Sequence, residues 1–265
     1  MTMRCDILTV FPGVVEAYLS VGVIGRAATS GLIEVHAHDL RKWAINRYGQ
    51  VDDEPYGGGP GMVLLAPAVV PAVHALASSR PGTPHVILPD ARGRRLDDAA
   101  ARELATHEWL LFVCGRYEGF DERVHEILAA DEISLGDFVL SGGELPALTI
   151  LDATLRHIPG VVGEWESVTG DSFTSGLLDY PVYTRPQVYA GREVPEPLTS
   201  GNHKKINDWR LEQSVRLTLR RRPDLVLANW KRLPAETRRE IERIARAEGI
   251  PWPLEPIPGD SSPTR

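Results

Sequence analysis

Strand-like and helix-like segments alternate from the N-terminus to about Pro159, and this order limits the fold more than any other feature of the chain. The stretch WLLFVCG at 109–115 is a continuous apolar run, typical of a parallel strand that is covered on both faces. Helical patterns follow most of the strand-like runs. The repeated β-then-α order predicts an α/β domain with a mainly parallel sheet.

Each expected element has an ordinary length. Strands are expected at 4–11, 32–40, 85–89, 109–115 and 131–135, and helices at 14–29, 68–79, 96–107, 121–130 and 145–158. A region rich in Gly, Pro, Ser and Thr at 160–197 indicates a linker or mobile loop. Further helices are expected at 204–221, 224–230 and 236–248, before a Pro-rich tail.

Charge is distributed unevenly along the chain. Residues 204–246 carry thirteen Lys/Arg against six Asp/Glu, a balance of +7, whereas the whole chain has a net charge of −7. This asymmetry suggests that the basic part meets an anion, although a solvated helical surface would look the same. The two cysteines lack paired spacing, and no signal peptide or long apolar run is present. These features favour the cytoplasm and exclude a membrane span.

Three glycine-rich segments follow or lie near predicted strand ends: YGGGPGM, CGRYEGFDER and LGDFVLSGGELP. Glycine there lets the backbone approach a flat ligand, and the apolar side chains beside it could enclose a purine. Ordinary tight turns would also need these glycines. The fingerprints of P-loop enzymes, dinucleotide-binding folds and serine hydrolases are all missing, so those classes lack support.

These segments, together with GEWESVTGDSF and YTRP…SGNHKKINDWR, resemble the bacterial tRNA (guanine-N1)-methyltransferases of the TrmD family. The motifs occur in the same order as in that family and span most of the chain. The resemblance implies a SPOUT fold, in which the α/β domain contains a deep trefoil knot and a small all-helical C-terminal domain follows. It divides the chain into a cofactor-binding and catalytic domain (1–160), a linker or lid (161–175), a helical tRNA-binding domain (176–250) and a disordered tail (251–265).

The resemblance also implies a site. S-adenosylmethionine would bind in the knot of an obligate homodimer, whose active sites form between the two subunits. The expected cofactor-binding residues lie on the glycine-rich segments and the predicted strand before them: Pro89, Gly115, Tyr117, Glu118, Gly119, Leu135, Gly136, Asp137, Phe138, Val139, Leu140, Gly142, Gly143 and Pro146. The family further suggests dependence on magnesium, but no carboxylate cluster in the sequence specifies an ion site.

The implied reaction methylates N1 of guanosine 37 in tRNA, next to the anticodon. Asp171 matches the general base of the family, which removes the N1 proton, and Arg156 matches the arginine that stabilises charge on the guanine O6. Without the resemblance, the favoured role of Asp171 is to cap a helix that starts at Ser172, and the default role of Arg156 is a surface or ion-pair one.

The basic segment then becomes the tRNA-binding surface, with expected RNA contacts at Asn202, His203, Lys204 and Arg210. Two segments depart from the family pattern. LPDARGRRL lacks the usual Ser–Pro before its glycine, and NRYGQVDDEP lacks a histidine before VDD. Two alternatives stay open: another SPOUT RNA methyltransferase, for example one acting on a ribose 2′-hydroxyl, or a non-catalytic nucleotide- or RNA-binding protein.

Overall fold

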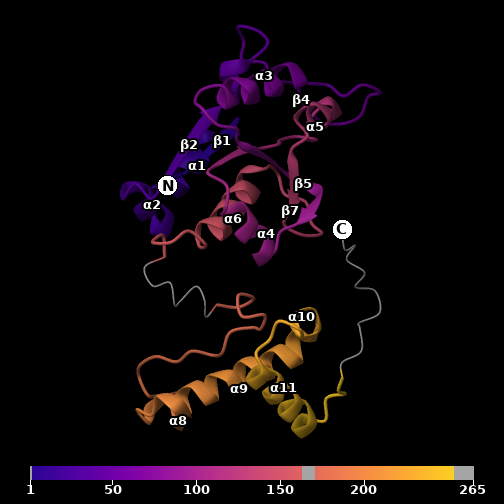
Figure 1. Cartoon of the computed structure of the whole chain (residues 1–265). Helices are drawn as coiled ribbons and strands as arrows, with labels where there is room; N and C mark the ends of the chain where they lie inside the picture. Colours follow the sequence, from indigo (N-terminus) through magenta and orange to yellow (C-terminus); the bar gives the residue numbers. More distant parts are fainter. Residues whose placement is uncertain (1, 163–170, 254–265) are drawn as a thin grey trace. The chain divides into compact units, whose positions relative to one another are not determined.

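The computed structural model describes residues 2–162 and 171–253, which belong to two compact units, Met1–Trp165 and Glu166–Arg265 (Figure 1). The first unit is built on a five-stranded parallel sheet with the strand order β2-β1-β6-β5-β7. Its strands are β1 (Met3–Thr9), β2 (Ile33–Asp39), β5 (His85–Arg95), β6 (Trp109–Val113) and β7 (Asp131–Ser134). The predicted α/β class and parallel sheet are confirmed.

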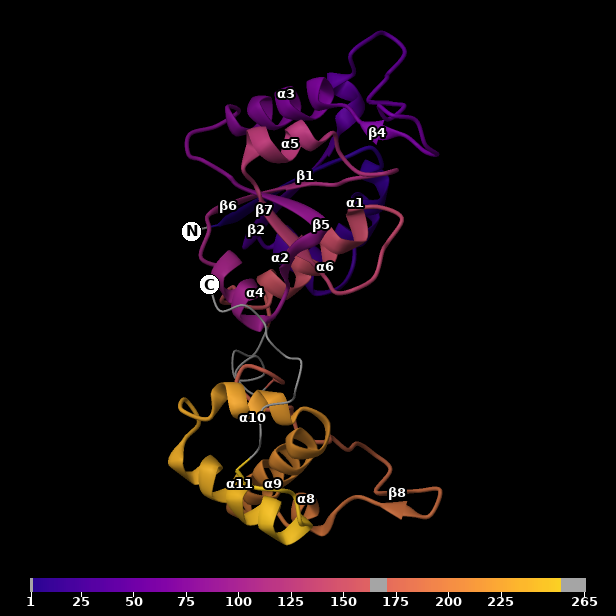
Figure 2. The ribbon, with the colours of Figure 1, turned by 90° about the vertical axis from the view of Figure 1, so that its right-hand side faces the viewer.

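Helices cover both faces of this sheet. On one face lie α3 (Ala66–Ala77) and α5 (Glu122–Leu128), as Figure 2 shows. On the opposite face lie α1 (Pro12–Leu19), α2 (Gly22–Thr29), α4 (Asp98–Leu104) and α6 (Glu144–Leu155). The unit also contains a short 3-10 helix, η1 (Leu40–Trp43), and an antiparallel pair, β3 (Asp52–Asp53) and β4 (Val63–Leu64).

Alternating side chains on the central strands build two cores, one on each face of the sheet. On β6, Leu110 and Phe112 pack against α1, α2, α4 and α6, whereas Leu111 and Val113 pack against α3 and α5. The strand therefore buries both of its faces, which explains its unbroken apolar sequence.

The prediction of one long helix at 14–29 was wrong. The segment 14–29 forms two helices, α1 and α2, separated by an extended Val21. Gly22 follows with a φ of +70°, a value that glycine adopts without strain. The apolar periodicity continues through the break, so the pattern alone could not locate it.

The second unit contains four helices among its described residues: α8 (Glu196–Thr199), α9 (His203–Arg221), α10 (Pro223–Asn229) and α11 (Ala235–Glu248). Val215, Val226 and Ile241, one from each of the last three, meet in its core. A small antiparallel ribbon, β8 (Val188–Tyr189) and β9 (Arg192–Glu193), lies in the stretch expected to be a linker or loop. It also lies within the predicted domain 176–250, so the expectation that this domain is all-helical was wrong there. The predicted lid (161–175) lies partly, and the predicted tail (251–265) largely, outside the described residues.

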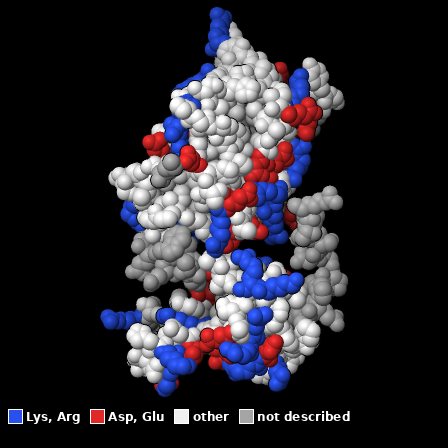
Figure 3. Space-filling view, viewed as in Figure 1, with Lys and Arg blue, Asp and Glu red and all other residues white. Residues whose placement is uncertain are grey.

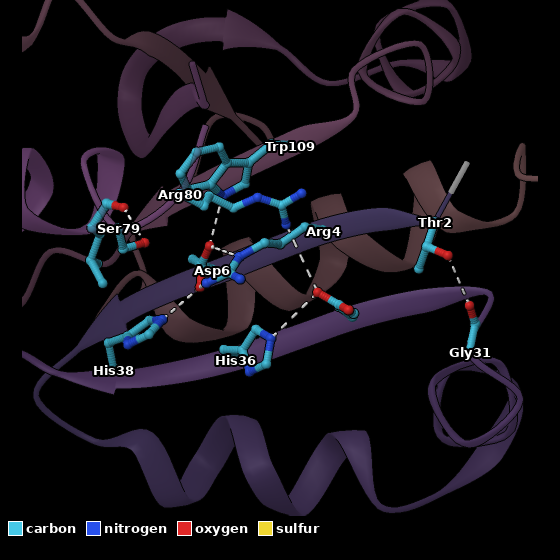
Figure 4. Close-up of polar contacts among 11 residues, drawn as sticks. Thr2, Arg4, Asp6, Gly31, His36, His38, Ser79, Arg80 and Trp109 are labelled. Carbon is cyan, nitrogen blue, oxygen red and sulfur yellow. Dashed lines mark hydrogen bonds and ion pairs between the residues drawn. The ribbon is translucent and has the colours of Figure 1, made fainter. Parts of the chain in front are cut away.

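A buried carboxylate joins three strands of the sheet (Figure 4). Asp6 on β1 is fully buried and accepts hydrogen bonds from Arg4 Nε (2.6 Å), His38 Nε2 (2.6 Å) and Trp109 Nε1 (2.6 Å). Burial by itself raises the pKa of Asp6, but these three donors outweigh it and hold the pKa well below its usual range. The carboxylate is therefore charged in the folded protein.

Among the described residues, no helix is both long and apolar enough to cross a lipid bilayer.

Candidate functional site

A cavity of about 460 Å³ opens in the first unit where the loops that follow β6 and β7 meet an irregular part of β5. Three stretches line it: 89–92 on β5, 115–125 after β6, and 133–146 from β7 to the start of α6. Its size is within the range of small-molecule sites, and its place agrees with the rule that ligands bind at the carboxyl ends of strands in α/β sheets.

The cavity brings together twelve of the fourteen residues expected to bind a cofactor. They are Pro89, Gly115, Tyr117, Glu118, Gly119, Leu135, Phe138, Val139, Leu140, Gly142, Gly143 and Pro146. Gly136 and Asp137, in the same loop, are not among the lining residues. The YGGGPGM segment does not line the cavity either, but its Gly61 lies against Glu118. A Cβ added to Gly61 would come within 2.6 Å of Glu118 Oε1.

Gly142 and Gly143 allow two chain segments to touch. A Cβ on Gly143 would lie 2.8 Å from both Cys114 Cα and the Gly115 nitrogen, and a Cβ on Gly142 would overlap Arg116 Nε. The Gly143 N–H donates to the Gly115 carbonyl at 2.7 Å. These glycines therefore serve backbone packing at the floor of the cavity, in addition to the proposed approach of a ligand.

We expect Gly143→Ala to destabilise the first unit by about 1–3 kcal/mol, because the new methyl group overlaps backbone atoms that cannot rotate away. The same variant should lose affinity for any ligand of the cavity. Hydrogen exchange of the amides in the first unit measures this loss of stability, with Gly13→Ala as the matched control. Gly13 lies in α1, and a Cβ added there would have no atom within 4 Å, so Gly13→Ala should not cause a clash. A Gly143→Ala variant as stable as the wild type would contradict the packing argument.

A charged pair links the cavity to the first strand. Glu144, the first residue of α6, is buried and accepts hydrogen bonds from Arg116 Nε (2.9 Å) and Thr9 Oγ1 (2.6 Å). Arg116 also donates to the Ser141 carbonyl at 3.1 Å. Beside this pair, burial raises the pKa of the Cys114 thiol, so the thiol stays protonated and is no nucleophile.

The sequence did not predict most of the polar residues on one side of the cavity. Arg92 Nη1 donates to Glu122 Oε2 (3.0 Å), and Nη2 donates to His125 Nε2 (2.9 Å). Because a guanidinium only donates, His125 must accept at Nε2 and donate from Nδ1 to Glu132 Oε1 (2.6 Å). These residues come from three separate elements. Glu122 lies in the CGRYEGFDER segment and Arg92 in LPDARG, but no motif predicted that they meet.

Arg156 and Asp171 belong to different units. Arg156 is exposed and occupies the C-cap position of α6 in the first unit. Asp171 lies in the second unit, where 172–175 form turns instead of the helix that Asp171 could have capped. Their roles in catalysis stay predictions.

The expected RNA contacts lie at the start of α9 and within its first half. Asn202 caps this helix, because its Oδ1 accepts from the backbone nitrogens of Lys204 (3.0 Å) and Lys205 (3.2 Å). Lys204 is exposed and paired with Asp208 at 2.7 Å. The guanidinium of Arg210 lies 4.9 Å from the centre of the Tyr180 ring. Asn202 thus has a clear structural role, whatever it contacts besides.

Comparison with known proteins gives one consistent answer. The family model described as tRNA (Guanine-1)-methyltransferase TrmD matches residues 3–228. A tRNA (guanine-N(1)-)-methyltransferase of Streptococcus suis is 51% identical over 224 residues, which cover 84% of this chain and 90% of the relative. Enzymes of the same name from Moorella thermoacetica and Limosilactobacillus reuteri are 47% identical over 248 residues and 48% identical over 227 residues. The Moorella match covers 93% of this chain and 98% of the relative, and the Limosilactobacillus match covers 84% and 90%.

Proposed function

The chain belongs to the tRNA (guanine-N1)-methyltransferase TrmD family, and on that premise we propose that it methylates N1 of guanosine 37 in tRNA with S-adenosylmethionine as the methyl donor. The observation that carries the proposal is the cavity, because the segments that carry the family resemblance, CGRYEGFDER and LGDFVLSGGELP, together form most of its lining.

The residues of the cavity suit this cofactor. Leu135, Phe138, Leu140 and Pro146 offer an apolar wall for an adenine ring, and the glycines beside them leave backbone groups accessible. Glu118 forms no ion pair within the described part of the chain, so its carboxylate suits a cationic group of the ligand. When bound, S-adenosylmethionine supplies an electrophilic methyl group on a sulfonium.

The protein must then supply a base. N1 of neutral guanine carries a proton, so its lone pair becomes available for methylation only as that proton leaves. Asp171 accepts the proton, and the Arg156 guanidinium donates hydrogen bonds to O6, where negative charge develops. A positioned general base contributes about 10²–10⁴-fold to the rate.

The finer part of the fold proposal is the deep trefoil knot of SPOUT proteins. The close approach of 141–143 to 114–116 supports it, because the start of α6 packs directly against the loop that follows β6. An isolated bridge between Arg116 and Gly142 adds to this contact. A knotted chain passes through its own loop, so the two segments must pack this closely.

The proposed active site needs two subunits. The cavity lies at the N-terminal end of α6 and Arg156 at its C-terminal end, and the twelve residues between them span about 18 Å. Arg156 therefore cannot reach the cavity of its own chain across that helix. Phe11, Val14 and Tyr18 at α1, with Leu145 on α6, are exposed large apolar side chains, which supports burial against a second copy.

Subunit complementation tests this arrangement. Leu140→Arg should block the apolar wall of the cavity, and Asp171→Ala should remove the base, so each variant alone should be nearly inactive. A mixture that forms heterodimers should recover activity, because one of its two sites combines an intact cavity with an intact Asp171 from the other chain. Recovery is measured as methyl transfer against each variant alone. Mixed dimers without activity would indicate that each site uses one chain only.

The second unit supports a tRNA surface. Figure 3 shows Lys and Arg side chains spread over its visible face with acidic side chains between them. Lys204, Lys205 and Arg220–Arg222 are exposed or lie at exposed helix ends, where phosphates could be held. Magnesium dependence stays a prediction, and no group of three or more potential metal ligands lies among residues 2–162 and 171–253.

The direct test is methyl transfer from labelled S-adenosylmethionine to unmodified tRNA with guanines at positions 36 and 37, followed by nucleoside analysis. We expect 1-methylguanosine at position 37, and no transfer when that guanine is replaced by adenine. A 2′-O-methylated nucleoside would agree with S-adenosylmethionine as the methyl donor but would contradict N1 as the methylated atom. Cofactor binding without any transfer would favour a binding protein.

A further inference from the structure

The β5 strand leaves the sheet for four residues at the edge of the cavity. Pro89 and Arg94 both face Ile133 on β7, so residues 90–93 form an excursion from the regular pairing. Gly93 anchors it against the neighbouring strand, because a Cβ there would overlap the carbonyl group of Glu132. Asp90, Ala91 and Arg92 are thereby placed on the cavity wall.

Hydrogen bonds hold the Asp90 carboxylate in one orientation. Its Oδ1 accepts from the Arg92 backbone nitrogen (2.8 Å) and from Arg92 Nε (3.3 Å). Glu122 and His125 hold Arg92 in turn (Figure 1 shows their helix, α5). Within the described residues Oδ2 has no hydrogen-bond partner, so one oxygen of an otherwise fixed carboxylate remains available at the cavity.

The two carboxylates of the cavity differ in what they can bind. The charge of Asp90 is offset by Arg92 at 3.3 Å, whereas Glu118 has no cationic partner in the described part of the chain. A cationic group of the ligand therefore favours Glu118, and a neutral hydroxyl donor suits Asp90. Other α/β folds use a carboxylate near a strand end in this way, to accept a hydrogen bond from a nucleotide ribose.

We infer that Asp90, oriented by Arg92, accepts a hydrogen bond from a ribose hydroxyl of the nucleoside that binds in the cavity. This rests on the proposed function, which supplies the nucleoside. It assigns a specificity role to the segment that departs from the family pattern, and it makes Arg92 a positioning residue that acts through Asp90.

Calorimetric titration with S-adenosylhomocysteine and its 2′-deoxy and 3′-deoxy analogues tests the inference. A hydrogen bond to a charged acceptor predicts that the wild type binds the parent compound about 10- to 100-fold more tightly than one of the deoxy analogues. Asp90→Ala should bind the parent more weakly and lose the preference. Asp90→Asn, which keeps a neutral acceptor, should retain part of it, and Arg92→Ala should reduce it.

Asp53→Asn is the matched control, since Asp53 is an exposed carboxylate on β3 outside the cavity lining. It should leave all affinities unchanged. An Asp90→Ala variant that still discriminates by the wild-type factor would overturn the inference and leave the proposed function intact. A wild type that binds none of the three compounds would overturn the proposed cofactor instead, and the inference with it.

Discussion

Replacing Asp171 by alanine is expected to slow methyl transfer by about 10²–10⁴-fold while S-adenosylhomocysteine binds within a few-fold of the wild-type affinity. The physical reason is that N1 of guanine must lose its proton as the methyl group arrives, and alanine offers no acceptor. The cavity lies in the first unit and Asp171 in the second, so removing this side chain leaves the cavity walls of its own chain intact.

Single-turnover transfer with cofactor and tRNA both saturating separates chemistry from binding. Asp171→Asn should be as slow as alanine, because it preserves the size of the side chain and removes the base. Glu193→Gln, an exposed acid on β9, provides the matched loss of charge and should behave as wild type. Wild-type rates for Asp171→Ala would show that another group takes the proton.

Replacing Asp6 by alanine is expected to destabilise the first unit by about 3–5 kcal/mol at neutral pH. The substitution leaves Arg4, His38 and Trp109 without their shared acceptor in a largely buried place (Figure 4). Hydrogen exchange of the amides in β1 and β6 measures this loss separately from the second unit.

A matched control lies on the neighbouring strand. Glu34 is 53% exposed and lies 3.9 Å from both His36 and Arg80. Such exposed pairs contribute about 0–1 kcal/mol, so Glu34→Ala should leave the exchange rates nearly unchanged. Equal effects of the two substitutions would mean that burial does not strengthen the Asp6 interactions.

The same carboxylate predicts how stability depends on pH. The pKa of Asp6 is lower in the folded than in the unfolded chain, so the unfolded state binds the proton more readily. The stabilisation is therefore fully present above the unfolded pKa of about 4 and is lost as the pH falls from there towards the folded pKa. Asp6→Ala should remove this part of the acid sensitivity.

Local patterns in the sequence were sufficient for most of the secondary structure. Continuous apolar runs predicted β6, and alternating segments predicted the β-then-α order, because both reflect which faces a single element must bury. Most of the expected cofactor-binding residues between Gly115 and Pro146 lie around one cavity, since glycine-rich loops after parallel strands meet at the same edge of a sheet. That they bind the cofactor stays a prediction.

Contacts between distant segments could not be predicted in this way. The break at Val21, the excursion of β5 at 90–93 and the chain of hydrogen bonds from Asp90 to Glu132 each depend on register and on which side chains meet in space. Neither a periodic pattern nor a motif contains that information.

The sequence by itself thus determined the α/β class, the parallel sheet and, through its ordered motifs, the methyltransferase family. Only the tertiary structure decided that Gly143 lies against Cys114, that Asp6 joins three strands, and that Arg156 is separated from the cavity by the length of α6. The physical reason is that propensity and burial act on neighbours along the chain, whereas a site is made by residues that become neighbours only when the sheet forms.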